Sequence, residues 1–192
     1  MENIKLKKPY TFEDKVYTEI DMSGAEKLTV QDAIDAQKAT AGQTAALVLP
    51  MTSMAFNLQL AAKATNLPIE FFKLLPMRAA QDVKIAMQKC MSSQKENKGL
   101  LMELDKPYSY NGKKYKEVEF TGADTITGMD MTMAENEVAA TGVVVTAPGN
   151  NFLYCCLMAA RASGLDKEFF TKLPICEMTK IHTMVNGESF FG

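Results

Sequence analysis

The residues that could carry out chemistry are few, and their spacing does not favour catalysis. His182 is the single histidine, and the nearest cysteine, Cys176, lies six positions earlier. Structural zinc sites take several cysteine or histidine ligands at closer spacing, and a cysteine nucleophile needs an adjacent base. We expect His182 to lie on the polar side of a final helix. The pattern predicts no enzyme and no metal site.

Carboxylates recur at corresponding places in the two halves of the chain, and each place is the expected start of a helix. An acid is stabilising there because it interacts with the helix dipole and with free N–H groups. The glycines are isolated, so no glycine-rich loop could cradle a phosphate. We interpret the carboxylates as helix caps and predict no cofactor. They are Asp32, Glu70, Asp130 and Glu168.

The composition carries no signal for export, membrane insertion or nucleic-acid binding. The formal net charge is -2, and no basic cluster is interleaved with aromatic residues, so nucleic acid is not an expected partner. No apolar run is long enough to span a bilayer, and no apolar signal segment follows the first residues. We expect a cytoplasmic protein without a membrane partner, whose four cysteines are reduced and mostly buried.

Methionine is unusually frequent, with fourteen residues. Its flexible thioether side chain either fills gaps in a core or forms a surface that accepts varied apolar helices. We favour the core interpretation for most of them. Met129, Met131 and Met133 occupy alternate positions, so on a helix they cannot all face one core. At least one of the three is then available to a partner.

The chain contains an internal repeat at a constant offset of 98 positions, so that Tyr108 corresponds to Tyr10 and Pro148 corresponds to Pro50. The match runs without a gap from Ile4–Met87 to Met102–Val185. It predicts a first unit at 1–91, a polar linker at 92–100 and a second unit at 101–192. We expect the units to pack as a pseudo-two-fold pair, with head-to-tail stacking as the alternative.

Each unit is predicted to be a β-hairpin followed by three to four helices, which gives an α+β fold. Asn111-Gly112 favours a type I′ turn, and Glu13-Asp14 stands at the same place in the first unit. A central helix with an apolar stripe follows, and then a short turn that places two phenylalanines in the core. The last helix of the first unit is expected to bury one face. That face consists of Met77, Ala80, Val83 and Met87.

The most informative short segments are Leu6-Lys7-Lys8-Pro9-Tyr10-Thr11-Phe12, Asp21-Met22-Ser23-Gly24, Leu28-Thr29, Ala61-Ala62-Lys63-Ala64 and Glu70-Phe71-Phe72. Through them, nearly all of each unit resembles the tail assembly chaperones of tailed bacteriophages and prophages. That family implies a non-catalytic assembly factor of the infected cell, which coats the long helical tape measure protein until tube subunits polymerise around it. Most members carry one unit, whereas this chain has two. A covalent pair could replace a homodimer or lengthen the coat laid down per chain, and a homo-oligomer of this chain stays open as a further association.

The expected partner is therefore a tape measure protein or a similar long helical protein, bound through adaptable apolar side chains. A virion structural protein, such as a tail tube or terminator-like subunit, is the alternative function, and an enzyme or small-ligand binder ranks third. Sequence alone does not separate core from groove residues, so the candidate partner-binding set contains both kinds. It comprises Met51, Met54, Phe71, Phe72, Met129, Met131, Met133, Phe169 and Phe170.

Overall fold

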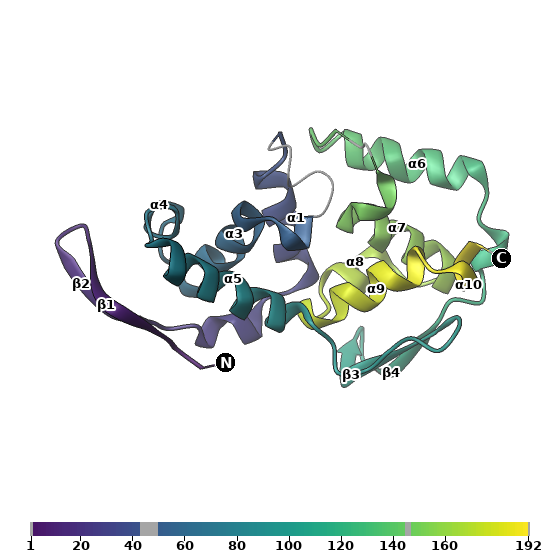
Figure 1. Cartoon of the computed structure of the whole chain (residues 1–192). Helices are drawn as coiled ribbons and strands as arrows, with labels where there is room; N and C mark the ends of the chain where they lie inside the picture. Colours follow the sequence, from purple (N-terminus) through teal and green to yellow (C-terminus); the bar gives the residue numbers. More distant parts are fainter. Residues whose placement is uncertain (1, 43–49, 145–146, 192) are drawn as a thin grey trace.

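The computed structural model describes residues 2–42, 50–144 and 147–191, and its elements form two units of the same order (Figure 1). The first unit contains β1 (Ile4–Phe12), β2 (Lys15–Ile20), η1 (Ser23–Lys27), α1 (Val30–Ala39), η2 (Pro50–Thr52), α3 (Met54–Thr65), α4 (Ile69–Lys73) and α5 (Met77–Met91). The second contains β3 (Leu101–Tyr110), β4 (Lys113–Glu119), η3 (Ala123–Thr125), α6 (Gly128–Ala139), η4 (Pro148–Asn150), α7 (Phe152–Ser163), α8 (Lys167–Thr171), η5 (Ile175–Glu177), α9 (Met178–Val185) and α10 (Glu188–Phe191). The α+β prediction is confirmed.

The two hairpins have the same register and the same turn geometry. Tyr10 faces Tyr17 across β1 and β2, and Tyr108 faces Tyr115 across β3 and β4. Asn111 and Gly112 have φ values of 48° and 77°, as a type I′ turn requires. Glu13 and Asp14 reach 47° and 59° without a glycine. The less favourable sequence of the first hairpin thus adopts the same turn.

The helices begin and end where the side chains favour it. Thr29 and Asp32 form a reciprocal capping box at the start of α1, and Thr127 and Asp130 form the same box at α6. The central helices α3 and α7 both end at a left-handed residue, Asn66 in one and Gly164 in the other. These signals recur at the repeat offset, so the local structure of the two units is alike.

Each hairpin packs on an aromatic side chain from a short helix. The Phe71 ring of α4 contacts the rings of Tyr10, Phe12 and Tyr17 edge-on, with centroids 4.8–5.4 Å apart. In the second unit the ring of Phe169 from α8 meets those of Tyr108, Tyr110 and Tyr115 at 4.9–5.6 Å. This packing attaches a two-stranded sheet, which is marginal alone, to the helices.

The units share one hydrophobic core, and the joint between them is built from both backbone and side chains. The Val30 N–H donates to the Leu173 carbonyl and the Ile175 N–H donates to the Leu28 carbonyl, each over 2.9 Å. The Phe56 and Phe152 rings lie 5.6 Å apart across the joint. The start of α1 therefore pairs with the segment that leads into η5.

Two more hydrogen bonds from one side chain fasten the joint beside the phenylalanine pair. Gln37 on α1 donates to the Asn150 carbonyl over 3.0 Å and accepts from the Phe152 N–H over 2.9 Å. Gln37 itself is buried, so its amide has both its donor and its acceptor engaged in a place that water does not reach. These contacts fix how α7 sits against α1.

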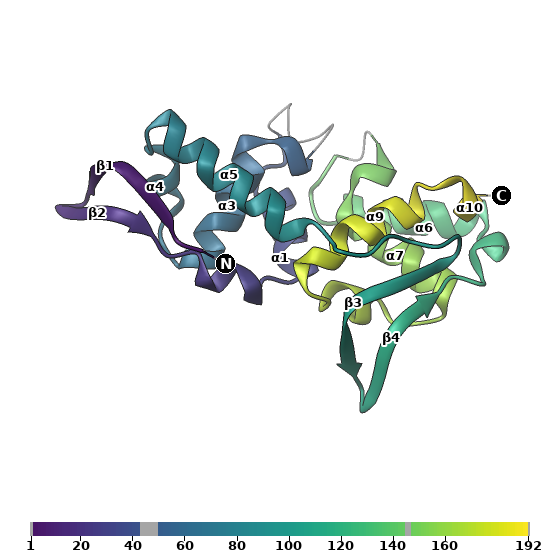
Figure 2. The same ribbon diagram turned by 60° about the horizontal axis from the view of Figure 1, so that its bottom comes forward.

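The expected pseudo-two-fold packing is wrong, because the contacts of the joint are not reciprocal. Two-fold symmetry would pair Ile126 with Met77 in the same way that Leu28 pairs with Ile175. Met77 is instead 81% exposed, whereas Ile175 is 3% exposed. In both views β1 and β2 lie at the end of the molecule far from the second unit, whereas β3 and β4 lie below α9 (Figure 1, Figure 2). The non-reciprocal joint corresponds to the head-to-tail alternative.

The segment 92–100 leads from α5 to β3 and is held against the second unit. Ser93 donates to the Asp105 carboxylate over 2.6 Å, and the Asn97 amide donates to the Lys180 carbonyl over 2.8 Å. These bonds limit how far the segment can move away from α9. The boundaries 1–91, 92–100 and 101–192 stay a prediction.

Candidate partner-binding surfaces

The four phenylalanines of the candidate set lie in the core. Phe71 and Phe72 on α4, and Phe169 and Phe170 on α8, are fully buried. The short helices place them there because one of each pair packs under a hairpin while the other ring lies 5.1 Å away, centroid to centroid. In this conformation none of the four is presented to a partner, and their role in binding stays a prediction.

The methionines of α6 divide between two sides of the helix. Met129 and Met133 are 70% and 52% exposed, and Met131 is half-buried against the core. Positions four apart lie above one another on a helix, so Met129 and Met133 form one apolar pair on the outer face. The Thr127–Asp130 capping box fixes the start of the helix and therefore the direction of this pair.

Arg161 of α7 lies beside the outer methionine pair. Its guanidinium forms an ion pair with Asp130 over 2.6 Å and lies 4.0 Å from the Met133 sulfur. The Thr127 hydroxyl and N–H bonds to Asp130, together with the charge of Arg161, lower the pKa of that carboxyl. The outer face of α6 thus combines two exposed thioethers with a fixed cation at its edge.

Met51 and Met54 are half-buried and pack against the hydrophobic core. They correspond to Gly149 and Phe152, the second of which is fully buried in the joint. Met77 was expected on the buried face of α5, and this expectation is wrong, because it is 81% exposed. The physical reason is the direction of packing: its counterpart Ile175 is covered by the first unit, whereas no unit covers Met77.

The cysteines are free thiols in environments that keep them protonated. Burial raises the pKa of Cys155 to about 12 and raises that of Cys156 well above its usual value. The pKa of Cys90 is also raised, chiefly by burial. A thiol with a raised pKa holds little thiolate at neutral pH and is a poor nucleophile.

His182 is half-buried on α9 rather than on an open polar face. Its Nε2 lies 3.4 Å from the side-chain oxygen of Asn150, and burial lowers the pKa of the imidazole. A lowered pKa favours the neutral ring at neutral pH. The sequence placed this residue on the correct helix, and its contact there is with a polar side chain.

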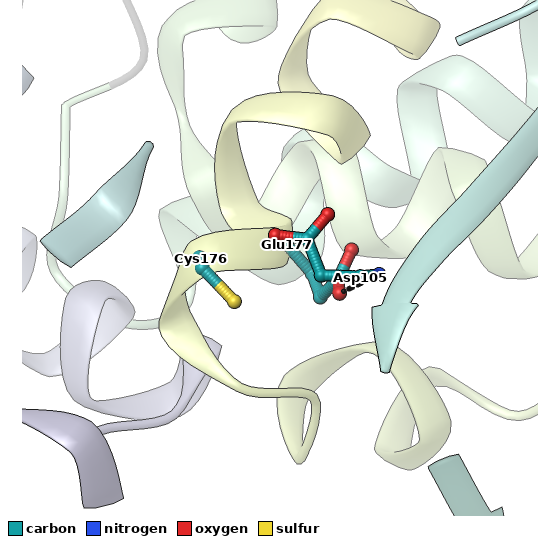
Figure 3. A group of neighbouring side chains, drawn as sticks. All are labelled: Asp105, Cys176 and Glu177. Carbon is teal, nitrogen blue, oxygen red and sulfur yellow. Dashed lines mark hydrogen bonds between the residues drawn. The ribbon is translucent and has the colours of Figure 1, made fainter. Parts of the chain in front are cut away.

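Within the described residues, one group of side chains has the composition of a metal site: Asp105, Cys176 and Glu177, whose ligand atoms lie within 4.8 Å of one another. Figure 3 shows Asp105 beside Glu177, and the Asp105 N–H donates to Glu177 over 2.8 Å. Burial, with nearby carboxylates adding to it, raises the pKa of Cys176 to about 11. A protonated thiol is a weak ligand, so this donor set does not favour a metal.

A lysine already supplies the positive charge that these carboxylates need. The Lys180 ammonium is 3% exposed and lies 2.9 Å from Asp105 and 2.6 Å from Glu177. Burial acts to raise the pKa of Asp105, but hydrogen bonds from Ser93, Gln94 and Lys180 outweigh it and lower that pKa. We interpret the cluster as a buried ion network that fixes β3 to α9. Sequence reasoning missed it because its members are far apart in the chain.

A hollow of about 360 Å³ lies at the end of the second unit, away from the joint. Its lining includes Ala123, Ile126 and Met131, together with Ser189 from α10. The corresponding first-unit residues Ala25, Leu28 and Ala33 are buried in the core. The second unit thus leaves open a place that is filled in the first.

The comparisons with known proteins agree with the family resemblance. Residues 3–93 match the family described as phage tail assembly chaperone proteins, E, or 41 or 14. No curated protein and no solved structure matches the chain. The resemblance is therefore confirmed over the first unit, and it supports a role in phage tail assembly that is non-catalytic and involves binding a tail protein.

No described helix is both long and apolar enough to cross a membrane.

Proposed function

We propose that this chain, whose first unit matches the tail assembly chaperone family, is a non-catalytic chaperone that binds and solubilises the tape measure protein during tail assembly. The family match carries the proposal. A tape measure protein presents long apolar helical faces that would aggregate before the tube encloses them. Its chaperone needs adaptable apolar contacts, each of modest strength, that are repeated along the partner.

The exposed methionine pair of α6 is our choice for the contact with the tape measure protein. Met129 and Met133 lie on one face of the helix, are exposed, and have flexible side chains that adapt to differing apolar helices. Arg161 at the edge of the pair could meet an acidic side chain of the partner. Met51, Met54 and Met131 lie at other faces of the two units.

The experiment is co-expression of the chain with the long helical protein encoded beside it, followed by affinity purification and light scattering after size exclusion. We expect the long protein to become soluble and to co-elute with several copies of this chain. If this chain elutes alone while the long protein precipitates, the proposed function is wrong.

A matched pair of variants tests the contact surface. Replacing Met129 and Met133 by glutamate removes two apolar contacts and should weaken capture of the long protein by more than about tenfold. Ala139→Glu places a glutamate on an exposed position of the same helix, outside the methionine pair, and should leave capture unchanged. Equal capture by both variants would move the contact away from this face.

The alternative of a virion structural subunit has less support. The strands of the described residues pair only within their own hairpins, in two two-stranded sheets, whereas a tube wall needs strands that continue between subunits. The two functions differ in the finished particle. A chaperone should be absent from purified tails analysed by mass spectrometry, and a tube or terminator subunit should be present in stoichiometric amount.

A further inference from the structure

The joint between the units is heterologous, and a heterologous joint leaves both of its surfaces open at the two ends of the chain. The first unit contributes its α1 side and the second contributes its η5 side. The second unit therefore still has an unused α6 side, and the first still has an unused α5 side. We call the unused surface of the second unit the head face (Ile126, Gly128, Met131 and Glu188) and that of the first the tail face (Met54, Leu75, Met77 and Arg78).

We propose that the tail face of one copy of this chain docks on the head face of a second copy, with the same contacts that join the two units within the chain. The proposal concerns purified chain alone and does not depend on the tape measure protein. Four sets of residues support it, and each set relates a filled contact of the internal joint to an open counterpart at the ends.

The first set is the pair of backbone hydrogen bonds. Val30 N–H and the Leu28 carbonyl bind Leu173 and Ile175 inside the chain. Their counterparts on the head face are the Gly128 N–H and the Ile126 carbonyl, and those on the tail face are the Leu75 carbonyl and the Met77 N–H. In the described parts of the chain, none of these four groups bonds to another backbone group. Docking would pair all four.

The second set is an apolar side chain and the hollow it would enter. Inside the chain, Ile175 is buried against the first unit and η5 contacts α1. The counterpart of Ile175 is Met77, the most exposed large apolar side chain among the described residues at 81%. Ile175 packs against the first unit, and the counterpart of that place in the second unit is the hollow of about 360 Å³ lined by Ile126 and Met131. A flexible methionine suits such a hollow.

The third set is a side-chain hydrogen bond whose counterpart residues lie at the ends of the chain. Inside the chain the Thr179 hydroxyl of α9 donates to the Met91 carbonyl over 3.0 Å. The counterparts are Gln81, which is exposed on α5, and Ser189, which lines the hollow. Gln81 also carries a side-chain donor, so the same bond can form between copies.

The fourth set is a pair of charges. Helix α5 contacts η5 across the joint. Burial raises the pKa of Cys176, and a thiolate on Cys90 would raise it further, so these two side chains lie near each other. Their counterparts are Glu188 on the head face and Arg78 on the tail face, both exposed. Docking would bring an acid beside a base at the rim of the joint, where opposite charges favour the correct partner.

Repetition of one heterologous joint gives a ring if the rotation closes and an open filament if it does not. In either form the methionine pair of α6 stays outside. The filled joint predicts this, because Gln31 and Asp35, the counterparts of Met129 and Met133, bond to each other over 2.9 Å and Asp35 is exposed. Each copy in an assembly would therefore still present its Met129 and Met133.

The experiment measures the mass of the purified full-length chain by sedimentation at increasing concentration. We expect species larger than a dimer for the wild type and monomer only for Met77→Asp. Ile85→Asp is the matched control, since Ile85 is also on α5 and 60% exposed but lies outside the tail face; it should assemble like the wild type. A chain that stays monomeric at every concentration, or that stops at a dimer, overturns the proposal.

A mixing experiment tests the direction of the joint. Gly128→Pro removes one N–H at the first position of α6, where proline is tolerated, and should weaken association about tenfold. With Glu188→Lys added, the head face is blocked while the tail face is intact. Mixed with Met77→Asp, this variant should give one-to-one heterodimers and nothing larger. A mixture of monomers, with the wild type still assembling, would mean that another surface is used.

Discussion

The two units have the same local structure, but equivalent faces are buried in one unit and exposed in the other. Leu28 and Ile175 meet in the joint, whereas their counterparts Ile126 and Met77 lie at opposite ends of the chain. The difference does not come from secondary structure, since caps, turns and aromatic packing recur in both units. It comes from packing order alone. The same sequence position is core in one unit and surface in the other.

The largest expected effect concerns the buried ion network of the second unit, which the first unit lacks. Lys180→Met leaves the Asp105 and Glu177 carboxylates buried without a cation, which should cost about 3–5 kcal/mol of unfolding free energy at neutral pH. Urea unfolding measures it. The counterparts of Glu177 and Lys180 are Ala79 and Asp82, so the first unit has no such network.

The pH dependence of the Lys180→Met variant gives an independent check. Burial already raises the pKa of Glu177 above its usual value, and loss of the ammonium should raise it further. A carboxyl whose folded pKa is raised binds its proton more tightly when folded, so stability increases as the pH falls through that pKa. Part of the loss should therefore be recovered in mild acid. Lys84→Met on α5 should change stability by less than about 0.5 kcal/mol at either pH.

The next effect contrasts a side chain buried in the joint with its exposed counterpart at the end of the chain. Ile175→Ala should cost about 3 kcal/mol, because it leaves a cavity between the units. Met77→Ala alters the same repeat position and should cost less than about 0.5 kcal/mol in dilute protein, because the side chain is exposed. Comparable unfolding midpoints for the two variants would contradict the direction of packing described above.

A smaller contrast concerns the glycines that follow the hairpins. A Cβ on Gly24 would lie 1.9 Å from the Ala64 carbonyl oxygen, and one on Gly122 would lie 2.9 Å from that of Ala162. Gly24→Ala must displace backbone and should cost about 3 kcal/mol, whereas Gly122→Ala should cost about 1 kcal/mol. Thermal unfolding of the two variants side by side gives the order. A larger loss for Gly122→Ala would show that the first unit relaxes more easily.

The smallest effect compares the hairpin turns. Asp14 has φ of 59°, a left-handed conformation that glycine adopts without strain. Asp14→Gly should stabilise the chain by about 0.5 kcal/mol, and the reverse change Gly112→Asp should destabilise it by about the same amount. The shift in melting temperature measures both. If both variants lose stability, Asp14 makes a contribution beyond turn geometry.

Much of the local structure could be predicted from short stretches of sequence. Asn111-Gly112 predicted a type I′ turn, and Thr127 with Asp130 predicted a helix start, because such signals depend on backbone geometry within a few residues. The alternate spacing of Met129, Met131 and Met133 also implied that they could not share one side of a helix. The structure places two of them outside and one inside.

The partner-binding set could be predicted only in part, for a physical reason. Hydrophobic periodicity reports that a face is buried, but not by what. Phe71 and Met77 both fit an apolar pattern, yet one lies under a hairpin and the other is exposed. The buried Lys180 gave no signal, since its partners Asp105 and Glu177 become neighbours only when β3 folds against α9.

The repeat, the α+β order of elements, the turns and the caps follow from the amino-acid sequence, because each depends on residues close in the chain. The head-to-tail stacking of the units is visible only in the packing of the folded chain. The reason is that two similar units can be related by more than one rotation, and the choice depends on how whole surfaces fit. That choice covers Ile175, exposes Met77 and leaves the hollow beside Ile126 open.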